Sequence, residues 1–437
     1  MPSLLSIATM VAVFSYIVVT YLRDMPRNNI PQHLLNQPAL FIEELISPES
    51  FAELNALMRE MKVFPSNMDD LRTIGFSPKH EHIGEGVPVE ADGSCAHKYL
   101  APNINRTHCI LPQRIDIGKH FITTGGPDAI REPFEKMISR VSSFGRYMFQ
   151  TVEDYPVVVK LFAQDKFQNA AKAICPADKQ FLDPFQFNFI MQVPGQTVAT
   201  HIDGAYFWGA TRKEVPQWLL ACMGFSGLFK DKFVDQVQVV GYLHDWQPTA
   251  EHGGTFVYYN TNSSTPDVMY PIPRAGALID GSKTVHAAVV YRKDVNAPVL
   301  NKDKRNELVY IGDEKWQLRV GDEVTENYDT NDLRMSVVYR ARCFRDEDER
   351  DHFYNLPDEE QMSLEFILET LMADLAARKR HTKEYLNSLS RLDLGMLLMK
   401  EYIQYPLPTK ETAMMPLNYC ALGKEVPMLK PLLSFVC

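Results

Sequence analysis

The sequence is poor in cysteine and has no excess of positive charge. Its seven cysteines are scattered over 437 residues, and none forms a Cys-x-x-Cys pair, so neither a disulfide framework nor a zinc ribbon is predicted. Such sparse cysteines fit a reducing compartment better than an oxidising one. Lys and Arg number 45 against 55 Asp and Glu, a net charge of −10. This balance argues against a nucleic-acid partner, because phosphates require a basic surface.

Internal repeats are absent, and long apolar runs are absent with one exception. Residues 4–22 form 19 consecutive uncharged and mostly apolar positions. At 1.5 Å per residue a helix of this length spans about 28 Å, which matches the roughly 30 Å of a bilayer core. We therefore predict that residues 4–22 form a transmembrane anchor, and that no later stretch spans a membrane.

The charges around this run predict its orientation. Arg23 and Arg27 follow it, whereas no Lys or Arg precedes it, and positive residues favour the cytosolic side. We therefore expect a single-pass protein of the endoplasmic reticulum whose main body faces the cytosol. Two glycosylation triplets, at residues 105–107 and 262–264, could be used only in the lumen, so the lumenal orientation stays open.

The remaining chain divides into regions by its sequence pattern. Prolines in residues 23–38 predict a linker. Residues 39–184 are interpreted as a helical and irregular support region, with a strand over 39–42 and a helix over 47–61 that begins at Ser-Pro-Glu. Residues 345–437 are interpreted as a helical extension, because leucines recur there at helical spacing.

Residues 185–344 have the sequence pattern of short strands separated by turns. The predicted strands cover residues 185–191, 237–243, 255–259, 277–280, 285–291 and 335–344. This pattern predicts an α+β fold in which a jelly roll, or double-stranded β-helix, is flanked by N- and C-terminal helices. Residues 293–331 are charged, and we expect them to form an irregular insertion between the last two strands.

Two histidines and an aspartate form a candidate metal site. His201 and Asp203 are two residues apart on an extended segment, so their side chains point to the same side. His286 lies on a later predicted strand. Two histidines and one carboxylate, with open positions left on the metal, are the ligand set of mononuclear non-haem Fe(II) oxygenases.

An arginine near the end of the jelly-roll region is a candidate anion clamp. Arg334 begins the last predicted strand, and Ser336 follows on the same strand face. A guanidinium can bind a carboxylate through two parallel hydrogen bonds, and a hydroxyl can add a third. Arg292, shortly after His286, is the alternative clamp. Arg334 is favoured because it brings a serine to the same face.

The order of these motifs resembles the Fe(II)/2-oxoglutarate-dependent dioxygenases, in their prolyl 4-hydroxylase-like branch. The shared pattern covers residues 39–61 and 185–344 and includes Gly195-Gln196, His201-x-Asp203, Gly253-Gly254-Thr255-Phe256, Gly276, His286 and Arg334-x-Ser336. The resemblance implies that His201, Asp203 and His286 hold Fe(II). It also implies that Arg334 and Ser336 bind the distal carboxylate of 2-oxoglutarate, that O2 is the oxidant, and that ascorbate is a further reductant.

The chain departs from the family pattern at one position near the metal motif. The family often has an aromatic residue three positions before the first ligand histidine, where this chain has Val198. One contact to 2-oxoglutarate is therefore missing or comes from elsewhere. Asn188, Gln186 and Tyr242 are the candidates for supplying it.

The resemblance implies hydroxylation, oxidative cyclisation or desaturation of an unactivated C–H bond, with release of succinate and CO2. The expected substrate is a small molecule or an amino-acid derivative, and modification of a peptidyl proline is the alternative. A catalytically inactive jelly-roll binding or scaffold protein is the alternative from another class. Asn188, Tyr206 and Trp208 are candidates for the substrate pocket, although core packing explains the two aromatic residues equally well. The presence of Asp203 argues against halogenation, because halogenating relatives replace this carboxylate.

Overall fold

The structure is a computed structural model, and the residues that it describes are 30–67, 86–97, 99–103, 105–124, 141–148, 152–249, 252–261, 265–292, 294–301, 304–406, 428 and 431. The predicted anchor at residues 4–22 and the triplet at 262–264 lie outside them. Among the described residues, no helix combines the length and the apolar character needed to cross a membrane.

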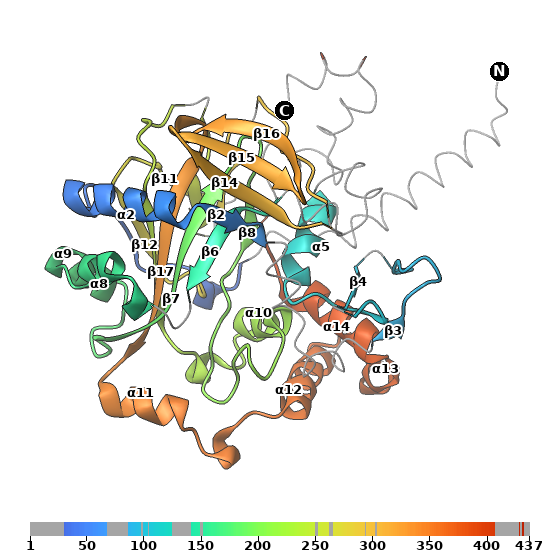
Figure 1. The fold of residues 1–437 in the computed structure, drawn as a ribbon. Coiled ribbons are helices and arrows are strands. Elements are labelled where there is room, and N and C mark those ends of the chain that lie inside the picture. The colour runs from blue at the N-terminus through green and yellow to red at the C-terminus, as the bar shows by residue number, and fades with distance from the viewer. Residues whose placement is uncertain are drawn as a thin grey trace.

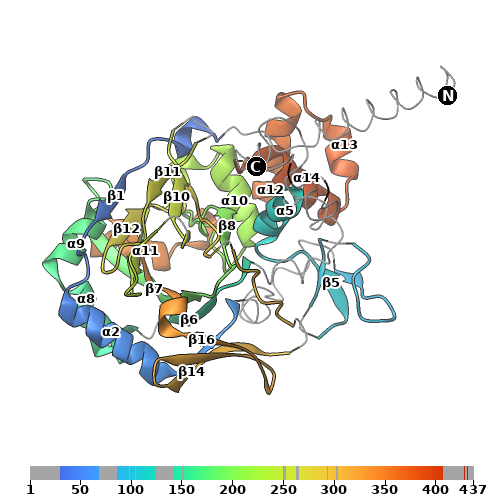
Figure 2. The same cartoon turned by 90° about the horizontal axis from the view of Figure 1, so that it is seen from above.

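Two antiparallel sheets face each other at the centre of the molecule (Figures 1 and 2). The larger sheet has the order β1-β12-β9-β17-β7-β6, and the smaller sheet has the order β11-β10-β13-β8. The larger sheet comprises β1 Ala39–Ile42, β6 Phe144–Met148, β7 Phe181–Gln192, β9 Gln236–Tyr242, β12 Gly276–Ile279 and β17 Arg334–Phe344. The smaller sheet comprises β8 Val198–His201, β10 Phe256–Tyr259, β11 Asp267–Met269 and β13 Val285–Ala288.

The path of the chain through these sheets is that of a double-stranded β-helix. From β7 to β10 each strand lies in the sheet opposite to the previous one, and the chain crosses again at β12, β13 and β17. This winding confirms the jelly-roll core that the sequence predicts. The predicted strands are all present, although β7 begins earlier than expected and β13 ends at Ala288 rather than Tyr291.

The alternation of residues along β7 determines which groups face the space between the sheets. Phe187, Phe189 and Met191 are fully buried in a core cluster on the outer face of the larger sheet. Asn188 and Gln192 occupy the alternate positions of the strand, point to the inner face and are also fully buried. Because side chains alternate with a period of two, one strand supplies both an apolar outer face and a polar interior.

Three helices cover the outer face of the larger sheet (Figure 1): α2 Pro48–Met61, α8 Pro156–Phe162 and α9 Asp165–Lys172. The α2 helix begins where the sequence predicts, because Ser47 Oγ accepts a hydrogen bond from Ser50 N at 3.1 Å. Leu54 and Met58 of α2 are fully buried in the same cluster as Phe187.

A second helical group packs around α10 Gln217–Ser226, whose residues from Trp218 to Phe225 are all buried. A helix that is apolar on every side belongs inside a core. Its neighbours are α5 Ile115–Thr124, α12 Leu364–Ala377, α13 Lys383–Ser388 and α14 Arg391–Tyr402. The predicted C-terminal helix is confirmed as α12, which buries Ile367, Leu371 and Leu375.

The insertion at residues 293–331 is not irregular, and this expectation was wrong. It contains β14 Asn306–Gly312, β15 Lys315–Val320 and β16 Glu323–Asp329, which form a sheet with β2 Val63–Pro65 in the order β16-β15-β14-β2. Trp316, Leu318 and Val320 alternate in β15 and are buried on one face. The sequence itself alternates here, with the polar residues Lys315, Gln317 and Arg319 between the buried ones, so this strand could have been predicted. A small fourth sheet contains β3 Val87–Pro88, β5 His108–Ile110 and β4 Ala101–Pro102.

Four of the described cysteines form disulfides, which contradicts the reducing environment expected from their scarcity. Cys95 is bonded to Cys109, and Cys175 is bonded to Cys343. The partners are separated by 14 and 168 residues, so only the folded chain reveals the second pair. Cys222, the remaining described cysteine, is a buried free thiol in α10.

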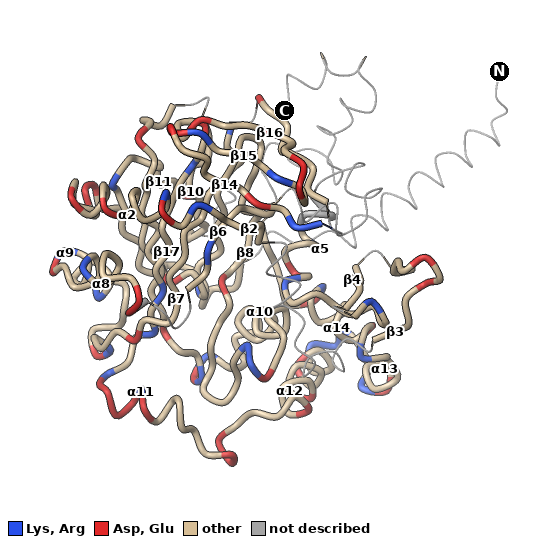
Figure 3. Tube along the Cα trace, in the orientation of Figure 1, with Lys and Arg blue, Asp and Glu red and all other residues tan. Residues whose placement is uncertain are grey.

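Charges of both signs are spread over the described chain, and no basic stripe runs along it (Figure 3). Acidic residues gather at the start of α11 Glu347–Tyr354, whose first turn contains Glu347, Asp348 and Glu349.

Candidate metal centre and anion pocket

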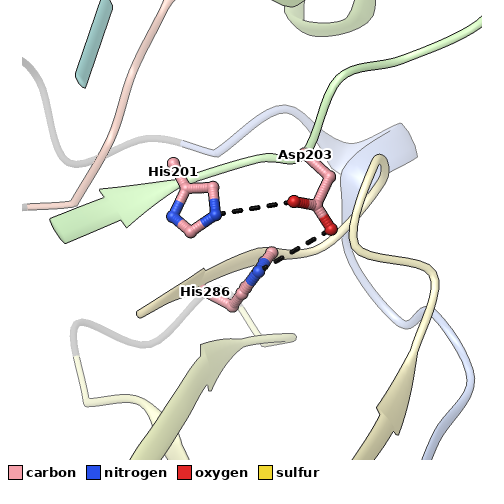
Figure 4. A group of neighbouring side chains, drawn as sticks. All are labelled: His201, Asp203 and His286. Carbon is pink, nitrogen blue, oxygen red and sulfur yellow. Dashed lines mark ion pairs between the residues drawn. The ribbon is translucent and has the colours of Figure 1, made fainter. Parts of the chain in front are cut away.

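His201, Asp203 and His286 come together between the two sheets (Figure 4). His201 ends β8 and lies directly opposite His286 in β13, because these two strands are paired. The carboxylate of Asp203 faces both rings, with Oδ1 3.6 Å from His201 Nε2 and Oδ2 4.0 Å from His286 Nε2. One ligand atom from each residue lies within 4.8 Å of the others. The structure therefore confirms that the three predicted ligands converge.

Backbone carbonyls orient both imidazole rings toward this point. His201 Nδ1 lies 2.7 Å from the carbonyl oxygen of Ala199, and His286 Nδ1 lies 2.9 Å from that of Thr284. A carbonyl can only accept a hydrogen bond, so each Nδ1 donates, and each Nε2 is the ring nitrogen turned toward the shared point. Burial lowers the pKa of His286 to about 4, so its ring is neutral at pH 7 and can bind a cation.

Asp203 supplies a buried negative charge with an unused oxygen. Burial by itself would raise the pKa of its carboxyl, but Arg340 and the two histidines hold that pKa well below its usual range. Arg340 Nε lies 3.8 Å from Asp203 Oδ2, and this oxygen is buried without a hydrogen-bond partner. A Cβ atom on Gly281 would lie 2.1 Å from the same oxygen, so only glycine leaves the carboxylate in place.

These residues fit a divalent metal ion. Two imidazole nitrogens and one carboxylate form a donor set that suits Fe(II) and leaves coordination positions for other ligands. The unpartnered Oδ2 of Asp203 is the observation that supports this fit, because a buried carboxylate oxygen without a partner is costly.

Arg334 is a buried cation without an anionic partner among the described residues. Its Nε donates to the carbonyl oxygen of Gly254 at 2.9 Å, and its Nη1 donates to Gln192 Oε1 at 2.8 Å. Only 3% of its surface is exposed. A Cβ atom on Gly254 would lie 2.8 Å from Arg334 Cδ, so the glycine at this position allows the arginine to enter.

The polar groups around Arg334 are also incompletely satisfied. Its guanidinium lies 5.3 Å from the centre of the Tyr242 ring. Gln192 Nε2, Tyr242 Oη and Tyr291 Oη are buried and have no hydrogen-bond partner in the part of the chain that the structure describes. Burial lowers the pKa of Arg334, but an arginine keeps its charge in proteins. A buried charge surrounded by unused polar groups fits an anionic ligand such as a carboxylate.

The structure distinguishes Arg334 from the alternative clamp, Arg292. The Arg292 side chain is 34% exposed and lies 3.7 Å from Asp294 and 3.8 Å from Asp332. Carboxylates of the chain itself therefore balance its charge. Ser336 is on the same strand as Arg334 and is buried, and its hydroxyl donates to the carbonyl oxygen of Ile190 at 3.3 Å.

The three candidate pocket residues are in different surroundings. Asn188 lies in the interior, where its Oδ1 accepts a hydrogen bond from Gln186 Nε2 at 2.9 Å and its Nδ2 has no partner. Tyr206 and Trp208 belong to a separate aromatic cluster, 5.2 Å from the Phe185 ring and 5.4 Å from the Phe353 ring respectively. A substrate-binding role for these three residues stays a prediction.

Sequence reasoning missed Arg340 and Gln238, which both lie beside the candidate metal ligands. Gln238 Nε2 is 3.4 Å from His286 Nε2, and Arg340 contacts Asp203 as described above. Arg340 could have been found from the sequence, because it lies an even number of positions after Arg334 and Ser336 and so shares their strand face.

No protein-family model matches the chain, and no curated protein does. Similar solved structures include a prolyl-4-hydroxylase of Pseudomonas putida, with 10% identity over 70% of this chain and 93% of that chain and a TM-score of 0.27. Another is SnoN, a non-haem α-ketoglutarate-dependent epimerase from nogalamycin biosynthesis, with 9% identity over 75% and 81% of the two chains and a TM-score of 0.31.

A third is a prolyl hydroxylase in complex with a hypoxia-inducible-factor peptide fragment, from Trichoplax adhaerens. It is 8% identical over 79% of this chain and 93% of that chain, with a TM-score of 0.30. Two of these proteins are prolyl hydroxylases and one is an α-ketoglutarate-dependent epimerase, and the sequence motifs resemble this class of enzyme. At such TM-scores, the likeness by itself carries no argument about the activity of this chain.

Proposed function

We propose that this protein is an Fe(II)- and 2-oxoglutarate-dependent dioxygenase that oxidises an unactivated C–H bond and releases succinate and CO2. One observation carries the proposal: the same interior contains a convergent His-Asp-His set and the buried Arg334, which has no carboxylate partner among the described residues. Each feature alone has an ordinary structural explanation. Together they match a metal cofactor and a dicarboxylate co-substrate, which is the combination that this reaction needs.

The residues have distinct roles in this proposal. His201, Asp203 and His286 would hold Fe(II), which supplies the oxidising chemistry once 2-oxoglutarate and O2 are present. Arg334 and Ser336 would bind and orient the distal carboxylate of 2-oxoglutarate. Tyr242, whose hydroxyl has no partner, is the best placed of the candidates for the contact that Val198 does not provide.

Apolar side chains between the candidate metal ligands and Arg334 would exclude water from the interior. Val240, Val338 and Phe256 belong to one buried cluster between the sheets. The Phe256 ring stacks on His286 with 5.4 Å between ring centres. A dry interior strengthens the interaction of Arg334 with a carboxylate and protects a reactive site from side reactions.

Within this reaction class we propose a small-molecule or amino-acid-derived substrate, and a peptidyl proline is the competing substrate. We also propose that residues 4–22 form a transmembrane anchor, because that run is long and apolar enough to cross a bilayer.

The test uses the full chain, purified in detergent and supplied with Fe(II), 2-oxoglutarate and O2. We expect iron-dependent succinate release that increases when the correct pool, of metabolites or of proline-containing peptides, is added. His201→Ala should lose both Mn(II) binding, measured by calorimetry, and succinate release. His352→Ala is the matched control, because His352 is half-exposed on α11. Absence of turnover with every pool, together with unchanged metal binding in His201→Ala, would favour the inactive binding protein.

A further inference from the structure

The turn between β4 and β5 carries the triplet Asn105-Arg106-Thr107 next to a disulfide. We propose that Asn105 carries an N-linked glycan and that this domain folds in an oxidising compartment of the secretory pathway. The proposal does not depend on the oxygenase activity. It reverses the cytosolic orientation that the charges after the apolar run predict.

The triplet lies at an accessible position. Asn105, Arg106 and Thr107 are all exposed. The fourth sheet, whose strands β4 and β5 flank this turn, lies at one side of the molecule, away from the two central sheets (Figures 1 and 2). A glycan requires a surface asparagine with Ser or Thr two residues later. The exposed tip of this turn meets both requirements.

The turn holds its shape without the side chain of Asn105. Asn103 is buried, and its Oδ1 accepts hydrogen bonds from the backbone N–H groups of Thr107 at 2.9 Å and His108 at 3.3 Å. Arg106 N donates to the carbonyl oxygen of Asn103 at 2.9 Å. Because Asn103 organises the turn, a glycan on Asn105 would extend into solvent without replacing any of these bonds.

The disulfides identify the compartment independently of the triplet. Cys95–Cys109 closes the loop that contains the turn, whereas Cys175–Cys343 joins the segment after α9 to β17 in a different core cluster. Cytosolic thiols are kept reduced, so two structural disulfides in separate parts of one domain are typical of proteins of the secretory pathway. The free thiol of Cys222 is buried, and burial raises its pKa, which keeps it unreactive.

The two observations support each other. A glycosylation triplet alone is a frequent chance event, and a triplet in a cytosolic chain is never modified. The disulfides place the domain on the side of the membrane where glycosylation occurs. The exposed triplet in turn lies in the loop that one of these disulfides closes.

Disulfide formation and N-glycosylation both use reagents that the secretory pathway supplies. Each disulfide forms when two thiols lose two electrons and two protons to an oxidised thiol–disulfide oxidoreductase, which becomes a dithiol. Glycosylation forms a bond between Asn105 Nδ2 and the first sugar carbon of a lipid-pyrophosphate-linked oligosaccharide. The bond from that carbon to phosphate breaks, the lipid pyrophosphate leaves, and the amide loses one proton.

The first experiment expresses the full chain in cultured animal cells and treats it with peptide N-glycosidase F. An Asn262→Gln background removes the second triplet, so that any remaining shift in gel mobility belongs to Asn105. We expect one glycosidase-sensitive step, its loss in Asn105→Gln and in Thr107→Ala, and its retention in Thr107→Ser, which keeps the hydroxyl. Identical mobility of Asn105→Gln and its parent, with and without the glycosidase, would overturn the site.

The second experiment tests the compartment without relying on the glycan. Cells are quenched in acid, labelled with N-ethylmaleimide in denaturant, and analysed by peptide mass spectrometry before and after reduction. We expect Cys95, Cys109, Cys175 and Cys343 to be labelled only after reduction, and Cys222 to be labelled before it. Labelling of all four without reductant would overturn the oxidising compartment.

Discussion

Arg334 and Arg292 have the same side chain, but the charges that surround them differ. Arg334 is buried beside neutral partners, Gly254 and Gln192, whereas Arg292 lies near two carboxylates at the surface. A free anion gains most from the cation whose charge is not already balanced. The structure therefore supports the choice of Arg334 as the clamp.

This difference gives the first prediction. Arg334→Ala should raise the KM for 2-oxoglutarate on the order of 100-fold, because it removes a buried charged partner of the carboxylate. Mn(II) binding measured without 2-oxoglutarate should not change. Arg292→Ala is the matched control and should leave the KM at its original value. The opposite result, a large effect of Arg292→Ala and a small one of Arg334→Ala, would assign the clamp to Arg292.

The close approach of Asp203 explains why position 281 is a glycine. An alanine methyl at this position would lie 2.1 Å from Asp203 Oδ2, so the carboxylate would have to move. We expect Gly281→Ala to weaken Mn(II) binding roughly 10- to 100-fold, the usual effect of disturbing the support of a metal ligand.

Gly224→Ala is the control for Gly281→Ala, because its added methyl would make only ordinary contacts, at 3.5 Å from Ile202 and 3.7 Å from Phe233. Calorimetric titration of both variants with Mn(II) checks the prediction. Equal affinities in the two variants would show that Asp203 does not bind the metal.

At the scale of elements, β17 connects the candidate site to the rest of the molecule. It carries Arg334, Ser336 and Arg340 on its inner face, and it lies between β9 and β7 in the larger sheet. Near its end, Cys343 is bonded to Cys175, which follows α9. The strand that positions the anion clamp is thus covalently attached to the helices on the outer face.

We expect the long-range disulfide to be important for stability. Replacing both Cys175 and Cys343 by alanine should lower the free energy of unfolding by about 2–5 kcal/mol, because the bond restricts the unfolded chain over 168 residues. Denaturant unfolding measures this loss. The Cys95→Ala/Cys109→Ala variant, whose loop spans 14 residues, is the comparison and should lose less. Dithiothreitol should destabilise the parent protein but not a variant that lacks both bonds, and a parent unaffected by the reductant would contradict the prediction.

Periodicity within single elements predicted most of the fold. The alternation of Phe187, Asn188 and Phe189 predicted β7, and the Ser47 cap predicted the start of α2. The same reasoning failed for β14, β15 and β16, because only β15 alternates clearly. Apolar residues lie on both faces of β14, and nearly every residue of β16 is exposed. A strand pattern is clear only when one face of the strand is apolar and buried and the other is polar and exposed.

At the scale of the whole molecule, the C-terminal helices and the candidate metal centre share one core. Ile202 and Val285, each adjacent to a metal-ligand histidine, belong to the same buried cluster as Leu371 of α12 and Leu398 of α14. Tyr405 Oη also lies 3.4 Å from Ile202 N. The helical extension therefore packs directly against the strands that carry the candidate centre.

This shared core predicts one cooperative unfolding transition. Leu371→Ala should lower the free energy of unfolding by about 2–5 kcal/mol and shift the same calorimetric transition that Mn(II) raises. Phe366→Ala, on the same helix but 53% exposed, should have little effect. Two separate transitions, with only the metal-independent one moved by Leu371→Ala, would show that the extension is an independent unit.

The three candidate metal ligands, the jelly-roll strands and the capped helix could all be predicted from the sequence. These features depend on residues close in the chain or on the period of two along a strand, and neighbours in sequence carry that information. The apolar run at residues 4–22 is also a property of the sequence alone.

Three features became visible only in the folded chain: which candidate arginine has no anionic partner among the described residues, which cysteines are paired, and that Arg340 and Gln238 border the candidate metal ligands. Each of these depends on groups that are far apart in the chain and close in space. Charge balance, disulfide bonding and burial are pairwise properties of the folded molecule, so no local pattern in the sequence can report them.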